Sequence, residues 1–123
     1  MRKLSRFSEH RLAMLRNLCI SLINNGRIIT TLHRAKELRM SIEPLITRAR
    51  DKTLHNRRIL LSYLNNNEEA VNKLFNIGQK NEKRPGGYTR VVRCGFRSDG
   101  GTKALIQIID YPQIEVGSDQ GNR

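Results

Sequence analysis

Apolar residues near the start of the chain recur with the period of an α-helix. From Leu12 to Ile23 they follow one another at steps of three and four residues, which places them on one helical face. Ser8 is suited to cap the start of this helix, and Gly26 is suited to end it. We therefore predict a basic N-terminal arm over residues 1–8, followed by a helix.

A strand and a second helix are predicted directly afterwards. Residues 27–31 form a short run rich in β-branched side chains, which favours an extended strand. From Leu32 to Ala49 a helical apolar stripe returns, and Thr31 is suited to cap it. Pro44 lies inside this stripe and lacks a backbone donor, so we expect it to kink or restart the helix.

The second half of the chain predicts two more helices and a β-hairpin. One helix is expected at about residues 54–64, and another between a cap at Asn67 and a stop at Gly78. Two strand-like runs then flank the Ser98–Thr102 segment, whose aspartate and glycines are typical of a hairpin turn.

Together these elements predict an α+β fold in the order α-β-α-α-α-β-β. The early strand should join the final hairpin, giving a small three-stranded mixed sheet packed against helices. We assign residues 1–8 to the basic arm and residues 9–111 to one domain. Residues 112–123 are polar and acidic, and we expect them to form a disordered tail.

The net charge of the chain indicates what kind of partner it binds. The 23 lysines and arginines outnumber the 11 aspartates and glutamates, which leaves a charge of +12. Sixteen of these cations are arginines, whose planar guanidinium matches phosphate oxygens well. A polyanion is therefore the expected partner. An anionic membrane surface is the alternative, but no predicted helix joins a cationic face to an exposed aromatic face.

The two cysteines indicate neither a metal site nor a redox pair. Cys19 and Cys94 are far apart, belong to no CxxC motif and lie among apolar residues. We expect both to be buried free thiols in a reducing compartment. The sequence shows no signal peptide and no apolar run long enough to span a membrane, which indicates a cytoplasmic protein.

No arrangement of residues predicts catalysis. The histidines at positions 10, 33 and 55 are too dispersed for a metal motif. Gly86 and Gly87 lack the following Lys and Ser or Thr of a nucleotide-binding loop, and no pair of acids stands in a pocket-like segment. We therefore predict a protein that is not an enzyme and that needs neither a cofactor nor a metal.

The segment from Arg84 to Arg90 is the clearest candidate for binding. Its two glycines allow a close approach of the backbone to a ligand, and arginines stand on both sides. A solvated hairpin entry is the competing interpretation of this segment. The residues predicted to contact RNA are Arg2, Lys3, Arg6, Arg11, Arg16, Arg57, Arg58, Lys83, Arg84, Tyr88, Arg90, Arg93 and Arg97.

The predicted mode of binding is recognition of RNA shape and backbone. Exposed aromatic pairs of an RNA-recognition platform are not expected from so few aromatic residues, and no helix gathers the residues of a DNA-recognition helix. Tyr88 could stack on an unpaired base or close the core beneath the loop. A nucleic-acid-processing enzyme, a free regulator and a helical protein-interaction module remain as alternative functions.

Four stretches resemble the bacterial large-subunit ribosomal protein seventeen family. They are Arg2–Arg6, Thr30–Arg39, Glu43–Thr47 and Gly86–Arg90, and they include the runs AKELR, EPLIT and GGYTR. Each run alone is weakly specific, but the collinear set is highly specific. The resemblance extends from about residue 2 to residue 110.

This resemblance implies a structural constituent of the large (50S) ribosomal subunit of a bacterium. The implied partners are 23S ribosomal RNA and neighbouring ribosomal proteins, including the zinc-ribbon protein thirty-two. The family has no enzymatic activity and no cofactor, and its fold is similar to the order predicted above. Its basic arm corresponds to Arg2, Lys3 and Arg6, and its basic turn to Arg84, Tyr88 and Arg90.

Overall fold

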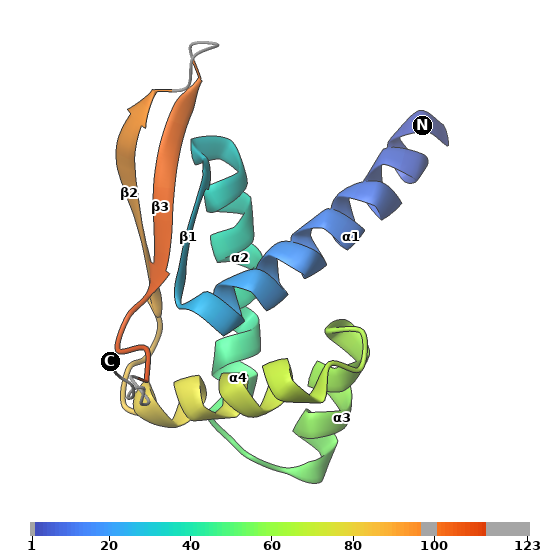
Figure 1. The fold of residues 1–123 in the computed structure, drawn as a ribbon. Coiled ribbons are helices and arrows are strands. Elements are labelled where there is room, and N and C mark those ends of the chain that lie inside the picture. The colour runs from blue at the N-terminus through green and yellow to red at the C-terminus, as the bar shows by residue number, and fades with distance from the viewer. Residues whose placement is uncertain (1, 97–100, 113–123) are drawn as a thin grey trace, which may run out of the picture.

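A computed structural model describes residues 2–96 and 101–112 of the chain, with side chains from residues 9–95 and 101–112. The predicted α-β-α-α-α-β-β order is confirmed (Figure 1). The elements are α1 (Arg2–Asn25), β1 (Arg27–Thr31), α2 (Leu32–Ala49), α3 (Leu54–Tyr63), α4 (Glu68–Lys80), β2 (Thr89–Phe96) and β3 (Thr102–Ile108).

The three strands form one sheet in the order β1-β3-β2. The prediction of a mixed sheet is wrong, because β3 pairs antiparallel with both of its neighbours. β1 and β2 do run in the same direction, but β3 separates them, so no parallel pair forms. The last strand in sequence is therefore the central strand of the sheet.

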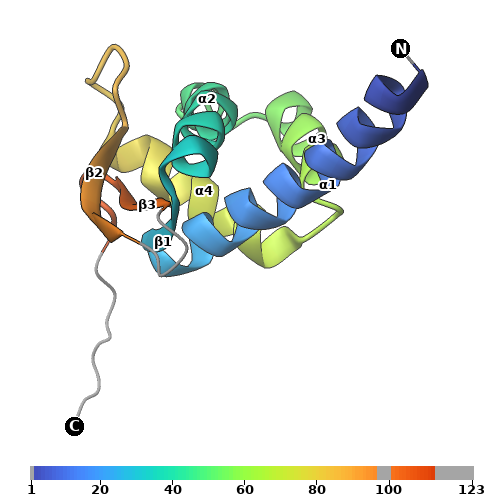
Figure 2. The same cartoon turned by 90° about the horizontal axis from the view of Figure 1, so that it is seen from above.

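The helices cover one face of this sheet (Figure 2). Across the strands, Ile28, Ile106 and Val91 form one row, with Ile106 fully buried in the core. Alternation along the strands sends the residues between them to the other face. Ile29 on that face is 62% exposed, and no helix of the described chain lies against that side of the sheet (Figure 2). The sheet is therefore buried on one side and open on the other.

Helix α1 begins earlier than the sequence predicts. It starts at Arg2, so Ser8 lies inside the helix and the expected cap there is wrong. No glycine or proline interrupts residues 2–8, and most of these residue types form helices readily. The basic arm is thus continuous with α1, whose N-terminal half projects away from the rest of the molecule (Figure 1).

Helix α2 is capped as predicted but does not restart at Pro44. The Thr31 hydroxyl accepts a hydrogen bond of 3.2 Å from the backbone N–H of Arg34. The helix then continues through Pro44 to Ala49. The missing proline donor would have bonded the carbonyl of Met40, in a turn where Met40 is 77% exposed.

Helix α4 has the predicted cap but a different end. The Asn67 side chain accepts a hydrogen bond of 3.0 Å from the backbone N–H of Ala70. Gly78 does not end the helix, which continues to Lys80. The glycine lies instead where α4 crosses α2, and a Cβ atom there would be 2.5 Å from the backbone carbonyl of Ala49. Its role is close helix packing.

The two cysteines have different environments. Cys19 is fully buried, and this burial raises the pKa of its thiol to about 12. Cys94 is exposed, so the prediction that it is buried is wrong. The β2–β3 register shifts between Arg93 and Gly95, and Cys94 is the extra residue of this irregularity. It therefore escapes the simple alternation that the sequence suggests.

Two predictions fall wholly or largely outside the described residues. The expected hairpin turn includes residues 98–100, and the expected tail includes residues 113–123. In the part of the chain that the structure describes, no helix is long and apolar enough to cross a membrane.

Candidate nucleic-acid interface

The Gly86–Arg90 turn is fixed to helix α2 by the carboxylate of Glu43. One oxygen of Glu43 accepts a hydrogen bond of 3.2 Å from the backbone N–H of Tyr88. The other accepts from the backbone N–H of Thr89 at 2.9 Å and from its hydroxyl at 2.8 Å. Two of the motifs found in the sequence, EPLIT and GGYTR, thus bind one another.

Tyr88 closes the core beneath this turn. Its side chain is fully buried, which agrees with the core-closing interpretation and leaves no ring surface for a base. Its hydroxyl lies 3.1 Å from the Thr47 hydroxyl and accepts a hydrogen bond of 2.8 Å from Arg50. Burial alone would raise the pKa of Tyr88, but these two hydrogen bonds and the Arg50 charge bring it below its ordinary value.

We expect Tyr88→Phe to lower the free energy of unfolding by about 1–2 kcal/mol. The change keeps the ring but removes the hydroxyl. The partly buried Arg50 guanidinium therefore loses one hydrogen-bond acceptor. Urea unfolding followed by circular dichroism measures the difference. Tyr63→Phe is the comparison variant, because the hydroxyl of this half-buried ring hydrogen-bonds with Ser41 and Cys19 and not with Arg50. An equal loss in both variants would contradict a specific role for the Arg50–Tyr88 hydrogen bond.

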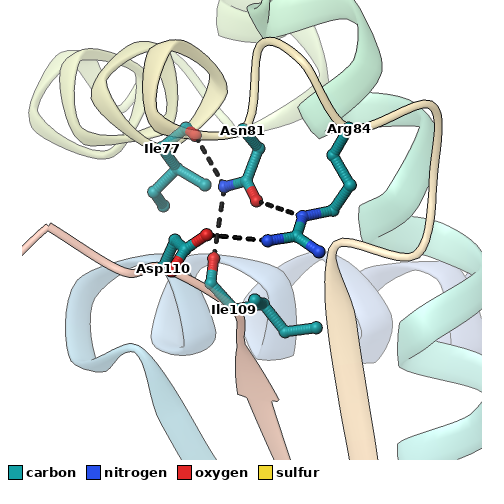
Figure 3. Close-up of polar contacts among 5 residues, drawn as sticks. All are labelled: Ile77, Asn81, Arg84, Ile109 and Asp110. Atoms are coloured by element: carbon teal, nitrogen blue, oxygen red, sulfur yellow. Dashed lines mark hydrogen bonds and ion pairs between the residues drawn. The ribbon is translucent and has the colours of Figure 1, made fainter.

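Arg84 belongs to a clamp that ties the basic loop, residues 81–88 between α4 and β2, to the segment just after β3 (Figure 3). Its Nε donates to the Asn81 side chain at 3.1 Å, and its Nη2 lies 2.7 Å from the Asp110 carboxylate. The buried amide of Asn81 also donates to the carbonyls of Ile77 at 2.9 Å and Ile109 at 3.2 Å. The guanidinium of Arg84 therefore has fold-internal partners on two of its nitrogens.

Two of the predicted arginines join helix α1 to other parts of the fold. Arg11 forms an ion pair with Glu37 of α2. Arg16 donates to the Asn65 side chain at 3.5 Å, and its guanidinium carbon lies 5.5 Å from the centre of the Tyr63 ring. These contacts hold α1 against α2 and against the α3–α4 connection.

Arg57 joins helix α3 to helix α4. It donates to the Asn72 side chain at 2.9 Å and lies 3.8 Å from the Glu68 carboxylate. Its neighbour Arg58 is exposed and has no such partner among the described residues. Adjacent arginines that look equivalent in the sequence thus differ in their freedom to bind a ligand.

The remaining predicted residues fall into three groups. Lys83, Arg90 and Arg93 are exposed and make no ion pair or side-chain hydrogen bond with the described part of the chain. The backbone of residues 2–6 is helical, but the side chains of Arg2, Lys3 and Arg6 lie outside the described set. Arg97 lies outside the described residues altogether.

The sheet carries the predicted Arg90 and Arg93 together with two cations that the sequence interpretation missed, Arg27 and Lys103. Its strands contain Arg27, Arg90, Arg93 and Lys103 but no aspartate or glutamate. Pairing of Arg27 and Arg90 with the same residue, Gln107, places both arginines in one row on the open face. The absence of acids in all three predicted strands was the available signal.

The start of helix α2 is also more basic than its sequence suggests. Glu37 is engaged by Arg11, and Glu43 faces the β2 start rather than the solvent. Three cations of this helix are exposed and unpaired within the described chain: Arg34, Lys36 and Arg39. The two acids of α2 are thus both occupied by contacts within the fold.

Nothing in the described geometry is arranged for metal chemistry. Across residues 2–96 and 101–112, no three side chains of His, Cys, Asp or Glu gather closely enough to hold a metal ion. The chemistry that the described surface offers is that of guanidinium and ammonium groups, whose natural ligands are phosphates.

Residues 14–110 match the family of ribosomal protein L17. The matched region extends from the middle of α1 to the residue after Ile109, so it contains the whole sheet, α2 to α4, and the Asp110 partner of Arg84.

Proposed function

Because the chain belongs to the ribosomal protein L17 family, and is thus a structural protein of the large ribosomal subunit, we propose that its free cations bind 23S ribosomal RNA. The family is a class of non-enzymatic proteins that bind ribosomal RNA and other ribosomal proteins. The proposed role is to fold and stabilise the RNA around it during subunit assembly, in the cytoplasm of a bacterium. Protein thirty-two is a proposed neighbour in the assembled subunit.

The observation that supports this proposal most is the division between occupied and free cations. Side chains elsewhere in the fold accept hydrogen bonds from three arginines: Arg16, Arg57 and Arg84. Arg90 and Arg93 instead belong to a sheet without a single acid. Phosphate contacts need guanidinium groups that are not already neutralised, so we assign RNA binding chiefly to the second set.

The shape of the molecule supports contacts at more than one place. The N-terminal half of α1, the start of α2 and the far end of the β2–β3 hairpin all lie at the same end of the molecule (Figure 1). Arg2, Lys3 and Arg6 fall on the first of these segments and Arg93 on the third. We propose that RNA contacts this end as well as the open face of the sheet. Arg58 and Lys83 would add contacts from α3 and the basic loop.

Sedimentation tests the proposal directly. The full chain, labelled and expressed in bacterial cells, should migrate with large ribosomal subunits in a sucrose gradient at physiological salt. Its affinity for purified 23S ribosomal RNA should fall linearly with salt on a double-logarithmic plot. Migration only as a free protein would refute a role in the subunit. An affinity independent of salt would refute phosphate contacts.

We expect Arg90→Ala to weaken binding to 23S ribosomal RNA more than Arg48→Ala does. Arg90 is exposed and unpaired in the described chain, whereas Arg48 donates a hydrogen bond of 3.1 Å to Asn56. Loss of one phosphate contact should reduce the salt slope by about 1 in the Arg90 variant. Filter binding over a salt series measures both slopes. Equal slopes in the two variants would contradict this assignment of the interface.

A further inference from the structure

The open face of the sheet has an ordered composition. Strand pairing places Arg27, Gln107 and Arg90 side by side, with one arginine on each edge strand and the amide on the central strand. The next outward row consists of Ile29, Leu105 and Val92. A basic and amide row thus lies beside an aliphatic row across the full width of the sheet.

The spacing of this first row suits two phosphate chains. Adjacent strands are separated by roughly 4.8 Å, so the backbones of Arg27 and Arg90 stand about 10 Å apart before their long side chains extend. Gln107 lies between them and offers both a donor and an acceptor. The row therefore presents cations at its two ends and a neutral hydrogen-bonding group at its centre.

A base-paired RNA helix presents the complementary pattern. Its minor groove is wide and shallow, its edges are phosphate backbones, and its floor displays 2′-hydroxyls and base edges. A flat sheet can lie over such a groove, with an amide toward the hydroxyls and arginines toward the two backbones. The aliphatic row, with Ile29 at 62% and Val92 at 43% exposure, can pack on the ribose rings.

Unpaired RNA would need a different surface. Proteins that bind single strands stack the bases on exposed aromatic rings. Among the described side chains, Phe75 and Tyr88 are buried, and Tyr63 and Tyr111 are partly buried against the core. The exposed large apolar residues of the described chain are all aliphatic. The described side chains of the open face therefore include none of the rings that single-strand binding requires.

We propose that the open face of the sheet binds the minor groove of base-paired RNA, with Arg27 and Arg90 on the two backbones and Gln107 on the 2′-hydroxyls. This inference rests on the proposed function and adds the class of RNA and the face that recognises it. It assigns to Arg27 and Gln107 a role in recognition that they share with Arg90.

Three probes of equal length and phosphate number test the class of ligand. They are an RNA hairpin with a fully paired stem, an unstructured RNA, and a DNA hairpin of the same sequence as the RNA hairpin. The full chain should bind the RNA hairpin about tenfold more tightly than either of the others, as measured by fluorescence anisotropy. Equal or tighter binding of the unstructured RNA would overturn the inference while leaving RNA binding itself intact. Failure to bind any of the RNAs would count against the proposed function instead.

Variants separate the two kinds of contact. Replacing both Arg27 and Arg90 with alanine should lower the salt slope for the RNA hairpin by about 2. The matched control replaces two exposed, unpaired cations outside the sheet, Lys52 and Lys80, with alanine. Gln107→Leu should reduce the preference for RNA over DNA about fivefold and leave the salt slope unchanged. If Gln107→Leu fails to fold by circular dichroism, Gln107→Thr replaces it.

The aliphatic row gives an independent check. Ile29→Asp places a carboxylate where the ribose rings should pack, at a position exposed enough to leave the core intact. We expect it to weaken binding to the RNA hairpin at least tenfold. Unchanged binding in this variant would overturn RNA docking on the open face. A neighbouring protein would then be the expected partner of that face. A double arginine variant that behaves like its lysine control would also overturn the inference.

Discussion

Glu43→Ala is expected to lower the free energy of unfolding by about 3 kcal/mol. The carboxylate accepts three hydrogen bonds, and its removal leaves the N–H groups of Tyr88 and Thr89 without their acceptor. Each buried donor left unsatisfied costs roughly 1–3 kcal/mol. The loss should appear as a lower midpoint in urea unfolding, with little change in slope.

Two further variants make this expectation specific. Glu82→Ala removes a carboxylate that is exposed and unpaired in the described chain, so it should change stability by less than about 0.5 kcal/mol. Glu43→Gln keeps one acceptor oxygen but turns a donor toward the other N–H, so its stability should fall between those of Glu43→Ala and the wild type. Similar effects at positions 43 and 82 would show that Glu43 does not hold the turn.

Gly78→Ala should destabilise the fold by about 3 kcal/mol, because the added methyl group collides with the backbone of α2. The Cβ atom would lie 2.5 Å from the carbonyl carbon and oxygen of Ala49, and 2.8 Å from the backbone nitrogen of Arg50. Backbone atoms cannot move aside as a flexible side chain can, so the two helices must separate. This cost exceeds the roughly 1 kcal/mol that alanine gains over glycine within a helix.

Gly86→Ala is the matched control for this substitution. A Cβ atom at Gly86 would meet nothing within 4 Å. Thermal and urea unfolding should therefore show almost no change at position 86 and a large loss at position 78. A stable Gly78→Ala protein would mean that the crossing of α2 and α4 is looser than the structure indicates.

Sequence patterns were sufficient to predict the order of the elements because their signals are local. Helical stripes, the Thr31 and Asn67 caps and the β-branched run before α2 each act within a few residues. The bounds were less certain where a residue type has two uses. Gly78 can end a helix or allow two helices to touch, and only the position of α2 decides between these uses.

The sequence did not distinguish the occupied cations from the free ones, since the partners of the occupied cations are distant along the chain. Arg84 is neutralised by Asp110, which lies 26 residues away, and Arg16 reaches Asn65, which lies 49 residues away. Conversely, the sequence around Arg27 did not predict an RNA contact. Only the pairing with β3 shows that Arg27 lies in one row with Arg90. Net charge predicted a polyanionic partner, but folding determines which of the arginines remain available to bind it.

The central position of β3 bears on the time at which the protein can complete its fold. The chain emerges from the N-terminus during synthesis, and neither β1 nor β2 has a strand partner until β3 has been made. Long-range pairing of this kind closes slowly, and unpaired strands are prone to associate with other chains. Helices α1 to α4 can form beforehand, whereas the open face, with its arginine and aliphatic rows, exists only after β3 has been made. The surface proposed to bind RNA can thus form only after all four helices have been synthesised.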